Sequence, residues 1–455
     1  MFNDAVFRSF VSKRPIAVMS QLAVSRLLAA GTVDGLFEEV AEEQYKRKLL
    51  FSSVTKVMAA VVMSKHASVN AAYKKMKADI GVSLNAFYNK LDRVEPVLSQ
   101  ALVRHAYQQV CEIRKNLGKN RHNGISGYRT RIVDGNHISR TEHRLAETRD
   151  INAAPLPGKS LVVLDPRYEA IADYFPIEDG HASERSTFDE LLATVCGGDL
   201  WIGDRNFCTY KVMLEINQRN AAFVVRKHQN LGTTGQGRRK RMGATETGKV
   251  FEQAINVSHE GQTIRLRLIE VELSGETRSG DTTLTILTNL PAESATAIEV
   301  AELYRTRWKI ETAFQVLTTT LNCEINTLCY PKAALFVFAL ALVSYNAIAV
   351  VQAAIARQRG RDFATQMSHY YMALEIAETT DGMLVALPLD RWEQMASTNT
   401  AGFNQALCRV AQAIDLSVYR KSKRAPKKPK KKPKDKSIVH VSTAKILAQR
   451  KRGAC

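Results

Sequence analysis

The sequence predicts a mixed α/β protein in which a central sheet is flanked by helical regions and interrupted by a β-rich segment. Before residue 128, apolar residues recur every three or four positions, which indicates helices. Between 128 and 227, short Val-, Ile- and Leu-rich runs alternate with helical patterns, which is typical of an α/β domain with a mixed sheet. From 228 to 303 the chain becomes Gly- and Thr-rich and contains further strand-like runs.

Composition limits the class of protein and the kind of partner. The chain has 455 residues, of which 45% are hydrophobic and 24% charged, so we expect a globular protein of two to four domains. Its formal charge of +19 calls for an anionic partner, either nucleic acid or an anionic membrane surface. The seven cysteines show no CxxC spacing, which favours reduced thiols over a disulfide framework or a zinc site.

These patterns divide the chain into five parts. The predicted parts are a helical N-terminal DNA-binding domain (1–127), a catalytic α/β domain in two pieces (128–227 and 304–370), a β-rich insertion (228–303), a helical C-terminal region (371–419) and a basic tail (420–455).

Within the N-terminal part, residues 67–94 resemble a helix, a turn and a second helix. Ser68 and Ser83 are expected N-caps, and Gly81 lies in the turn. The second helix would expose a polar face to the major groove of DNA, as a helix-turn-helix does. The alternative is an ordinary helical hairpin with a solvated face. The residues predicted to line the DNA-binding face are Asn85, Tyr88 and Asn89.

Two segments carry dense positive charge. Residues 228–249 form a Gly-rich arm that is either a mobile basic loop laid on DNA or a disordered surface loop; its DNA-binding candidates are Arg238, Arg239, Lys240 and Arg241. Residues 420–437 hold eleven Lys or Arg side chains against one acid, Asp435, so we expect a tail that does not pack and that binds phosphate at low salt.

One apolar segment is long enough to cross a bilayer. Residues 333–355 have the necessary length, but many are alanines and Ser344, Tyr345, Asn346 and Gln352 interrupt the run. We therefore expect a buried helix in a large core, and no membrane partner. The N-terminus, with Asp4, also lacks the layout of a secretory signal.

Three acids occupy positions that suit a metal site. Asp134 lies inside an apolar strand, where a carboxylate is costly to bury without compensation. Asp204 follows a strand at its carboxyl end, and Glu311 lies in a helix predicted for 298–321. Carboxylate oxygens suit Mg²⁺. Other acids compete for this role, namely Asp165, Asp173, Glu178 and Asp179.

The order of these motifs resembles the DDE transposases of bacterial insertion sequences, in the IS-four branch. The signature helix of that family has the spacing Y-x2-R-x3-E, which Tyr304, Arg307 and Glu311 reproduce. Asp134-Gly135 is similar to the context of the family's first Asp.

Further motifs extend the resemblance over residues 125 to 355. Asp204, Arg205 and Phe207 match the D-R-x-F context of the family's second Asp, and Tyr345-Asn346 matches a Tyr-Asn pair in the apolar run. The β-rich insertion lies between the second Asp and the Glu, as in the family.

The resemblance implies a fold, a chemistry and roles for single residues. The catalytic core would be ribonuclease-H-like. Asp134, Asp204 and Glu311 would be catalytic and would bind two Mg²⁺ ions, for which Mn²⁺ can substitute. Tyr304 and Arg307 would contact DNA near the cleaved phosphate.

The resemblance also bears on three further residues. Arg205 would bind phosphate or pair with a neighbouring acid, and Trp308 is expected to be a core anchor rather than a base stacker. The family signature ends with a Lys or Arg seven residues after the Glu, and Thr318 stands there instead.

The implied function is cleavage of double-stranded DNA at the ends of a mobile element and joining of those ends to target DNA. A homodimer on paired ends and a cytoplasmic, nucleoid-associated location in a bacterium follow from the resemblance. The alternatives are a stand-alone nuclease on the same fold and a non-catalytic DNA-binding relic of a transposase.

Overall fold

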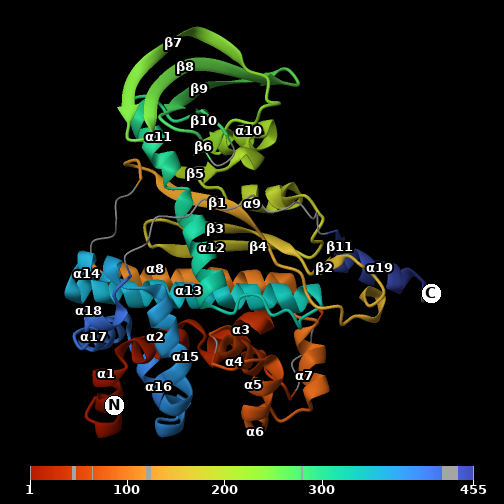
Figure 1. Cartoon of the computed structure of the whole chain (residues 1–455), viewed down its shortest axis with the longest axis vertical. Coiled ribbons are helices and arrows are strands. Elements are labelled where there is room, and N and C mark those ends of the chain that lie inside the picture. The colour runs from red at the N-terminus through yellow and green to blue at the C-terminus, as the bar shows by residue number, and fades with distance from the viewer. Residues whose placement is uncertain are drawn as a thin grey trace.

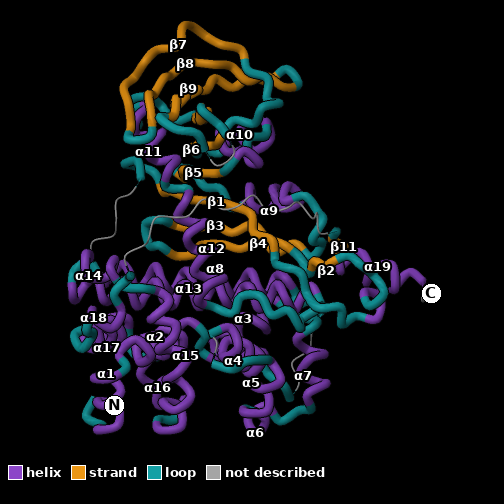
Figure 2. Tube along the Cα trace, in the orientation of Figure 1, coloured by secondary structure: helices purple, strands orange, loops and turns teal. Residues whose placement is uncertain are grey.

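The computed structural model describes residues 2–43, 48–63, 65–118, 124–277, 280–422 and 439–453. A large mixed sheet stands on a layer of helices to which both ends of the chain contribute (Figure 1). Figure 2 shows the same division, with the strands gathered in one half of the molecule and most helices in the other. The predicted α/β class with helical flanks is confirmed at this level.

The sheet has nine strands in the order β4-β3-β1-β5-β6-β10-β9-β8-β7. β5 pairs parallel with β1, and β6 pairs parallel with β5. All other pairings in this sheet are antiparallel. The strands are β1 (Arg129–His137), β3 (Lys159–Asp165), β4 (Ala170–Ile177), β5 (Asp199–Gly203), β6 (Ala222–Arg226), β7 (Thr234–Thr245), β8 (Gly248–His259), β9 (Gln262–Leu273) and β10 (Thr283–Thr288).

The central strands are apolar because both of their faces are covered. Ile132 and Val133 are neighbours in β1, yet they belong to separate apolar clusters on opposite faces of the sheet. Short helical segments connect the parallel strands. These segments are the 3-10 turn η2 (Glu184–Thr187) and α9 (Phe188–Ala193) before β5, and the 3-10 turn η3 (Arg205–Phe207) and α10 (Tyr210–Gln218) after it.

The N-terminal region is helical, as its periodicity predicts. Its helices are α1 (Ala5–Lys13), α2 (Pro15–Leu27), α3 (Ala30–Val40), α4 (Phe51–Val62), α5 (Val69–Lys75), α6 (Lys77–Ile80), α7 (Leu84–Leu91) and α8 (Pro96–Leu117). Ser68 and Ser83 cap α5 and α7 through their side chains, and Gly81 has the left-handed backbone (φ 65°) that a turn requires.

The apolar segment forms α13 (Pro331–Arg359), the longest helix described. It is long and apolar enough to cross a membrane, but 94% of its most apolar window is buried inside the protein. It packs on α8, α2, α4 and β4. A second apolar stretch, Pro15–Val40, passes the same test of length and composition and is 61% buried. The remaining helices of this layer are α14 (Arg361–Gln366), α15 (His369–Ala386), α16 (Leu389–Ala396), α17 (Thr400–Ala411) and α18 (Leu416–Tyr419).

The prediction that the Gly-rich arm is a loop is wrong, because the arm contains the edge strand β7. It pairs with β8 in an antiparallel hairpin, and the pairing register shifts twice along it. The sequence does not indicate this strand, because the segment is rich in glycine and positive charge and shows no apolar alternation. Its side chains are almost all exposed. β8, β9 and β10 join the strands of the α/β segment through the pairing of β10 with β6.

The single helix predicted for 298–321 is two helices, α11 (Ala297–Arg305) and α12 (Trp308–Thr320). The backbone amides of Thr306 and Arg307 bond three residues back, to Leu303 and Tyr304. The Thr306 hydroxyl also donates to the Leu303 carbonyl at 2.7 Å. A threonine that competes for a helix carbonyl tightens the chain locally and separates the two helices.

Residues 439–453 dock against the α/β part. β11 (His440–Ser442) pairs parallel with β2 (Ala154–Leu156), and α19 (Thr443–Gly453) follows it. The docked helix makes ion pairs through Lys445 with Asp179 and through Arg450 with Glu147, both at 3.2 Å. Residues 423–438 of the predicted tail lie outside the described residues.

Candidate active site

Asp134 and Asp204 come from two neighbouring parallel strands. β1 and β5 pair with Ile132 opposite Ile202, so each acid lies two residues further along its own chain. Asp134 is still in β1, whereas Asp204 follows β5 and caps η3 by accepting a hydrogen bond from the Asn206 amide at 2.8 Å. Because the pairing is parallel, the two carboxylates stand at the same edge.

Arg307 links the third acid to the first. Its Nη1 donates to Asp134 Oδ2 at 2.8 Å, and its Nη2 donates to Glu311 Oε1 at 2.6 Å. Arg307 lies at the start of α12, so Glu311 follows it by one helical turn. The guanidinium therefore sits between a strand acid and a helix acid and partly neutralises both.

The electrostatics of Asp134 reflect this crowding. Burial raises the pKa of Asp134 to about 7, and the negative charges of Asp204 and Glu311 act in the same direction. Arg307 opposes the rise. Asp134 is thus poised between its charged and neutral forms near neutral pH. A second cation brought to this edge would favour the charged form.

The three acids supply hard oxygen donors, but Arg307 lies between two of them, Asp134 and Glu311. Among the residues that the structure describes, no group of three or more His, Cys, Asp or Glu side chains is placed to hold a metal ion. Donor chemistry and charge suit a divalent cation, provided that Arg307 withdraws from Asp134 and Glu311. The six described cysteines are free thiols.

Three of the four competing acids form ion pairs elsewhere, and Glu178 is half-buried directly after β4. Asp165 is 2% exposed and pairs with Arg131 at 2.6 Å. Asp173 pairs with Arg104 at 2.8 Å, and Asp179 pairs with Lys445 of α19. Asp165, Asp173 and Asp179 thus bind structural cations, whereas Asp134, Asp204 and Glu311 lie near enough to act on one another.

Tyr304 is a buried neighbour of Arg307. It is 7% exposed at the end of α11, and burial raises the pKa of its hydroxyl. The tyrosine interacts with Arg307 through a side-chain hydrogen bond that also affects this pKa. Its visible role is to support Arg307.

The expectation that Trp308 is a core anchor is wrong. The side chain is 58% exposed, and the guanidinium of Arg307 lies 5.7 Å from its ring centroid. Trp308 is the first residue of α12, next to the break between the two helices. An exposed indole next to Arg307 is compatible with the alternative role of stacking on a base.

Glu184 is a site residue that the sequence did not reveal. Its Oε2 accepts a hydrogen bond from the Asn206 side-chain amide at 2.6 Å, two residues from Asp204. A Cβ added to Gly135 would overlap the Glu184 carboxylate. Glycine after Asp134 thus leaves room for the acid that holds η3. The only sequence signal was the Asp-Gly pair itself, because Glu184 lies far away along the chain.

The remaining polar candidates lie on the surface of the catalytic edge. Arg205 is exposed, and its charge lowers the pKa of Asp281, although hydrogen bonds from Arg226 and Thr277 contribute more to that shift. Thr318 is exposed on α12, where its hydroxyl donates to the Phe314 carbonyl at 3.0 Å.

Within the basic cluster on β7, Arg239 makes contacts inside the hairpin. Arg239 donates to Glu270 at 2.6 Å and to Glu272 at 2.8 Å, and its guanidinium stacks 3.6 Å from the Phe251 ring centroid. Arg239 therefore has a structural role in the hairpin. The other members of the cluster are exposed: Arg238, Lys240 and Arg241.

The predicted polar face of α7 is present only in part. Asn85 and Asn89 are exposed, whereas Tyr88 is half-buried with its ring 6.2 Å from that of Phe87. α7 lies in the helical layer, at the opposite end of the molecule from β7 (Figure 1). Any DNA held at both places would have to run along the length of the protein.

Comparison with known proteins supports one class. Residues 125–347, just under half of the chain, match the model of the family described as "Transposase DDE domain". The matched stretch includes Asp134, Asp204 and Glu311 and ends within α13. It supports a DDE transposase as the class of protein to which this chain is related.

The other two comparisons are more distant. The cryo-EM structure of piggyBac transposase in a synaptic complex with hairpin DNA is similar to this chain with a TM-score of 0.38 and 11% sequence identity, over 85% of each chain. No curated protein matches the chain.

Proposed function

We propose that this protein is a DDE transposase of the Tyr-Arg-Glu type, which cuts DNA at the ends of its mobile element and joins those ends to target DNA. One observation carries the proposal. The parallel pairing of β1 with β5 and the two contacts of Arg307 gather Asp134, Asp204 and Glu311 at one edge of the sheet. The transposase-domain match over 125–347 supports the same reading.

We assign the core a ribonuclease-H-like fold. The order β4-β3-β1-β5-β6 supports this assignment. In this sheet β1, β3 and β4 are antiparallel neighbours, and β5 and β6 run parallel to β1. Helix α12 then contacts β1 and carries the third acid. The remaining four strands extend the sheet beyond β6 as an insertion.

Asp134, Asp204 and Glu311 would hold two Mg²⁺ ions, or Mn²⁺ in their place. Such ions stabilise the charge on the attacking and leaving oxygens of a phosphoryl displacement. Asp134, with its raised pKa, would lose its proton when it binds the ion. Arg307, released from both carboxylates, would then face the phosphate backbone with two free donors.

Double-stranded DNA is the proposed partner, as both element end and target, and a homodimer would hold the paired ends. The exposed cations of β7 and the asparagines of α7 are the proposed contacts beyond the catalytic edge. The location would be the bacterial cytoplasm, on the nucleoid.

The test uses single variants Asp134→Ala, Asp204→Ala and Glu311→Ala of the full chain. Each should reduce Mg²⁺-dependent nicking of a labelled duplex, taken from the DNA that flanks the gene, by roughly a thousandfold or more, because each removes a metal ligand. DNA binding in a gel shift and the melting temperature should be retained.

Matched controls are Asp189→Ala and Glu190→Ala, which remove exposed acids of α9. Asp165 is unsuitable, because its loss would leave Arg131 buried without its partner. Near wild-type cutting by any one of the three variants would remove that residue from the site. Cutting without joining would favour a stand-alone nuclease, and DNA binding without metal-dependent cutting by the wild type would favour a non-catalytic relic.

A further inference from the structure

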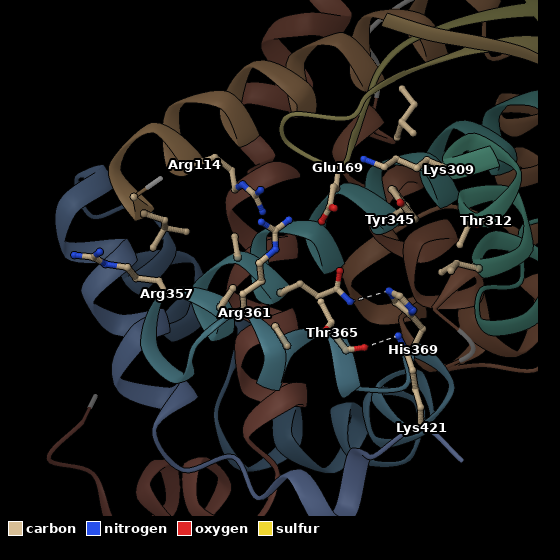
Figure 3. A pocket seen from close by; sticks show the side chains of 18 residues that line it. Arg114, Glu169, Lys309, Thr312, Tyr345, Arg357, Arg361, Thr365, His369 and Lys421 are labelled. Atoms are coloured by element: carbon tan, nitrogen blue, oxygen red, sulfur yellow. Dashed lines mark hydrogen bonds between the residues drawn. The ribbon is translucent and has the colours of Figure 1, made fainter. Parts of the chain in front are cut away.

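A cavity of about 560 Å³ lies on the other side of α12 from the acids. Lys309, Thr312 and Val316 of α12 line it, at helical spacings of three and four. Glu311 and Arg307 point from a different face of the same helix toward β1. The helix therefore separates the catalytic edge from the cavity, and α8, α13 and α14 complete its walls (Figure 3).

The cavity lining is strongly basic. Five of its residues are Lys or Arg, and Glu169 is the one acid among the lining residues that the structure describes. In Figure 3, Arg114, Arg361 and Glu169 lie close to one another in the cavity. The five cationic lining residues are Arg114, Lys309, Arg357, Arg361 and Lys421.

Two of these cations donate hydrogen bonds to backbone carbonyls, and the nearby charges of Glu169 and Asp165 compensate Arg114 in part. Arg114 donates to the Ala349 carbonyl at 3.3 Å, and Lys421 donates to the Thr365 carbonyl at 2.7 Å. Like charges gathered in a half-enclosed space repel one another unless an anion joins them. The arrangement thus has an excess of positive charge that a phosphate group would balance.

The rest of the lining is apolar, with a few polar groups. Leu117, Leu164, Val316 and two alanines of α13 provide apolar surface, and Tyr345 adds an aromatic ring. A wall of this kind accepts the flat face of a base.

Polar groups stand beside this wall. His369 bonds through Nε2 to the Gln352 side chain at 2.8 Å, and Thr365 lies nearby in the lining. Burial lowers the pKa of His369 to about 4, so the imidazole is neutral at pH 7 and adds a hydrogen-bonding group rather than a charge.

We propose that this cavity binds a nucleoside phosphate, with the phosphate among the arginines and the base against the apolar wall. The volume lies in the range of small-ligand pockets. The nucleotide can be part of a DNA strand that passes α12 or can be free in solution, and the recognising chemistry is the same. The site goes beyond the proposed catalysis and does not depend on it, because none of the three acids lines it.

The test compares two variants of the full chain with a matched control. Arg361→Gln removes one exposed cation of the lining, and Ala356→Leu fills space in the cavity without changing charge. Lys115→Gln removes an exposed cation of α8 that does not line the cavity. All three positions are at least partly exposed, so folding should be preserved, as a melting curve will check.

Binding is measured by calorimetry with adenosine monophosphate, and by anisotropy with a short 5′-phosphorylated single strand at high salt, where contacts of the basic tail are weakened. We expect Arg361→Gln and Ala356→Leu each to weaken binding by roughly tenfold or more, since each loses a charge-assisted contact or the space for the base. Lys115→Gln should match the wild type.

The two probes distinguish the sources of the nucleotide. Saturable binding of the monophosphate supports a free nucleotide, and binding of the strand alone, sensitive to both variants, supports a nucleotide within DNA. The proposal is overturned if neither variant weakens binding of either probe. It is also overturned if inorganic phosphate competes as strongly as the nucleotide, because the apolar wall would then contribute nothing.

Discussion

Replacing Arg307 by alanine tests whether this arginine competes with a metal ion. The guanidinium holds Asp134 at 2.8 Å and Glu311 at 2.6 Å, and both contacts must break before the two carboxylates can share an ion. In Arg307→Ala this competition is absent. We expect the variant to bind a divalent cation more tightly than the wild type when no DNA is present.

The size of the effect follows from the burial of the two pairs. A hydrogen bond to a charged group contributes roughly 1.5–3 kcal/mol when well buried. The Asp134 side chain is 18% exposed, but that of Glu311 is 35% exposed, so solvent screening reduces the second contribution. The two contacts of Arg307 together oppose metal binding by about 1–2 kcal/mol. The affinity of Arg307→Ala for a divalent cation should therefore be roughly 5- to 30-fold higher than that of the wild type.

The assay is titration with Mn²⁺, in which free ion is counted by electron paramagnetic resonance. Arg305→Ala is the matched control, because Arg305 is two residues away and pairs with Glu302 and Glu246 rather than with the site acids. Its affinity for Mn²⁺ should equal that of the wild type.

Loss of DNA cutting in Arg307→Ala would not distinguish a competitor from a simple phosphate contact, so metal affinity is the deciding measurement. If the variant binds Mn²⁺ no more tightly than the wild type, the guanidinium does not compete for the carboxylates. If it binds more weakly, Arg307 organises the acids for the ion instead of blocking it.

Two further predictions concern Asp134 and its neighbour. Because the pKa of Asp134 is about 7 in the folded chain against an ordinary 3.8, the folded state holds the proton more tightly, and stability should fall as pH rises from about 4 to about 7. The loss is at most about 4 kcal/mol, and Asp134→Asn should remove it from melting curves; an unchanged pH slope would contradict the assignment. Gly135→Ala should destabilise the fold by only about 1 kcal/mol, because the overlapped Glu184 carboxylate ends a flexible side chain and can move at the cost of its hydrogen bond with Asn206. Adding Glu184→Ala should recover part of that loss, whereas simple additivity of the two costs would show that they do not meet.

The meeting of Asp134 and Asp204 at one edge is predictable because each of the two acids carries a local signal. Asp134 interrupts an apolar strand, and Asp204 directly follows one. A parallel arrangement of those strands is enough to bring the two acids together, and strand–helix alternation predicts that arrangement. The pattern does not contain the contacts of Asp134 and Glu311 with Arg307, because these hydrogen bonds depend on how α12 packs against β1.

β7, the exposure of Trp308 and the role of Glu184 also depend on contacts that the sequence pattern does not contain. β7 was taken for a loop because an edge strand needs no apolar face, and its hydrogen bonds to β8 leave no trace in composition. Trp308 is large and apolar, which favours a core position, but it begins α12 after the break at Thr306 and is exposed. Glu184 was missed because its contact with Asn206 depends on the folded path of two loops rather than on spacing.

The break at Thr306 also changes how the Tyr-Arg-Glu spacing should be understood. In one continuous helix, residues 304, 307 and 311 would share a face, and all three side chains would reach the same ligand. Here Tyr304 lies in the last turn of α11 and is buried, whereas Arg307 is the N-cap of α12 and reaches Asp134. The same spacing therefore yields one supporting residue and two residues at the catalytic edge. α12 thus directs Arg307 and Glu311 toward β1, while Lys309, Thr312 and Val316 on its other side line the basic cavity.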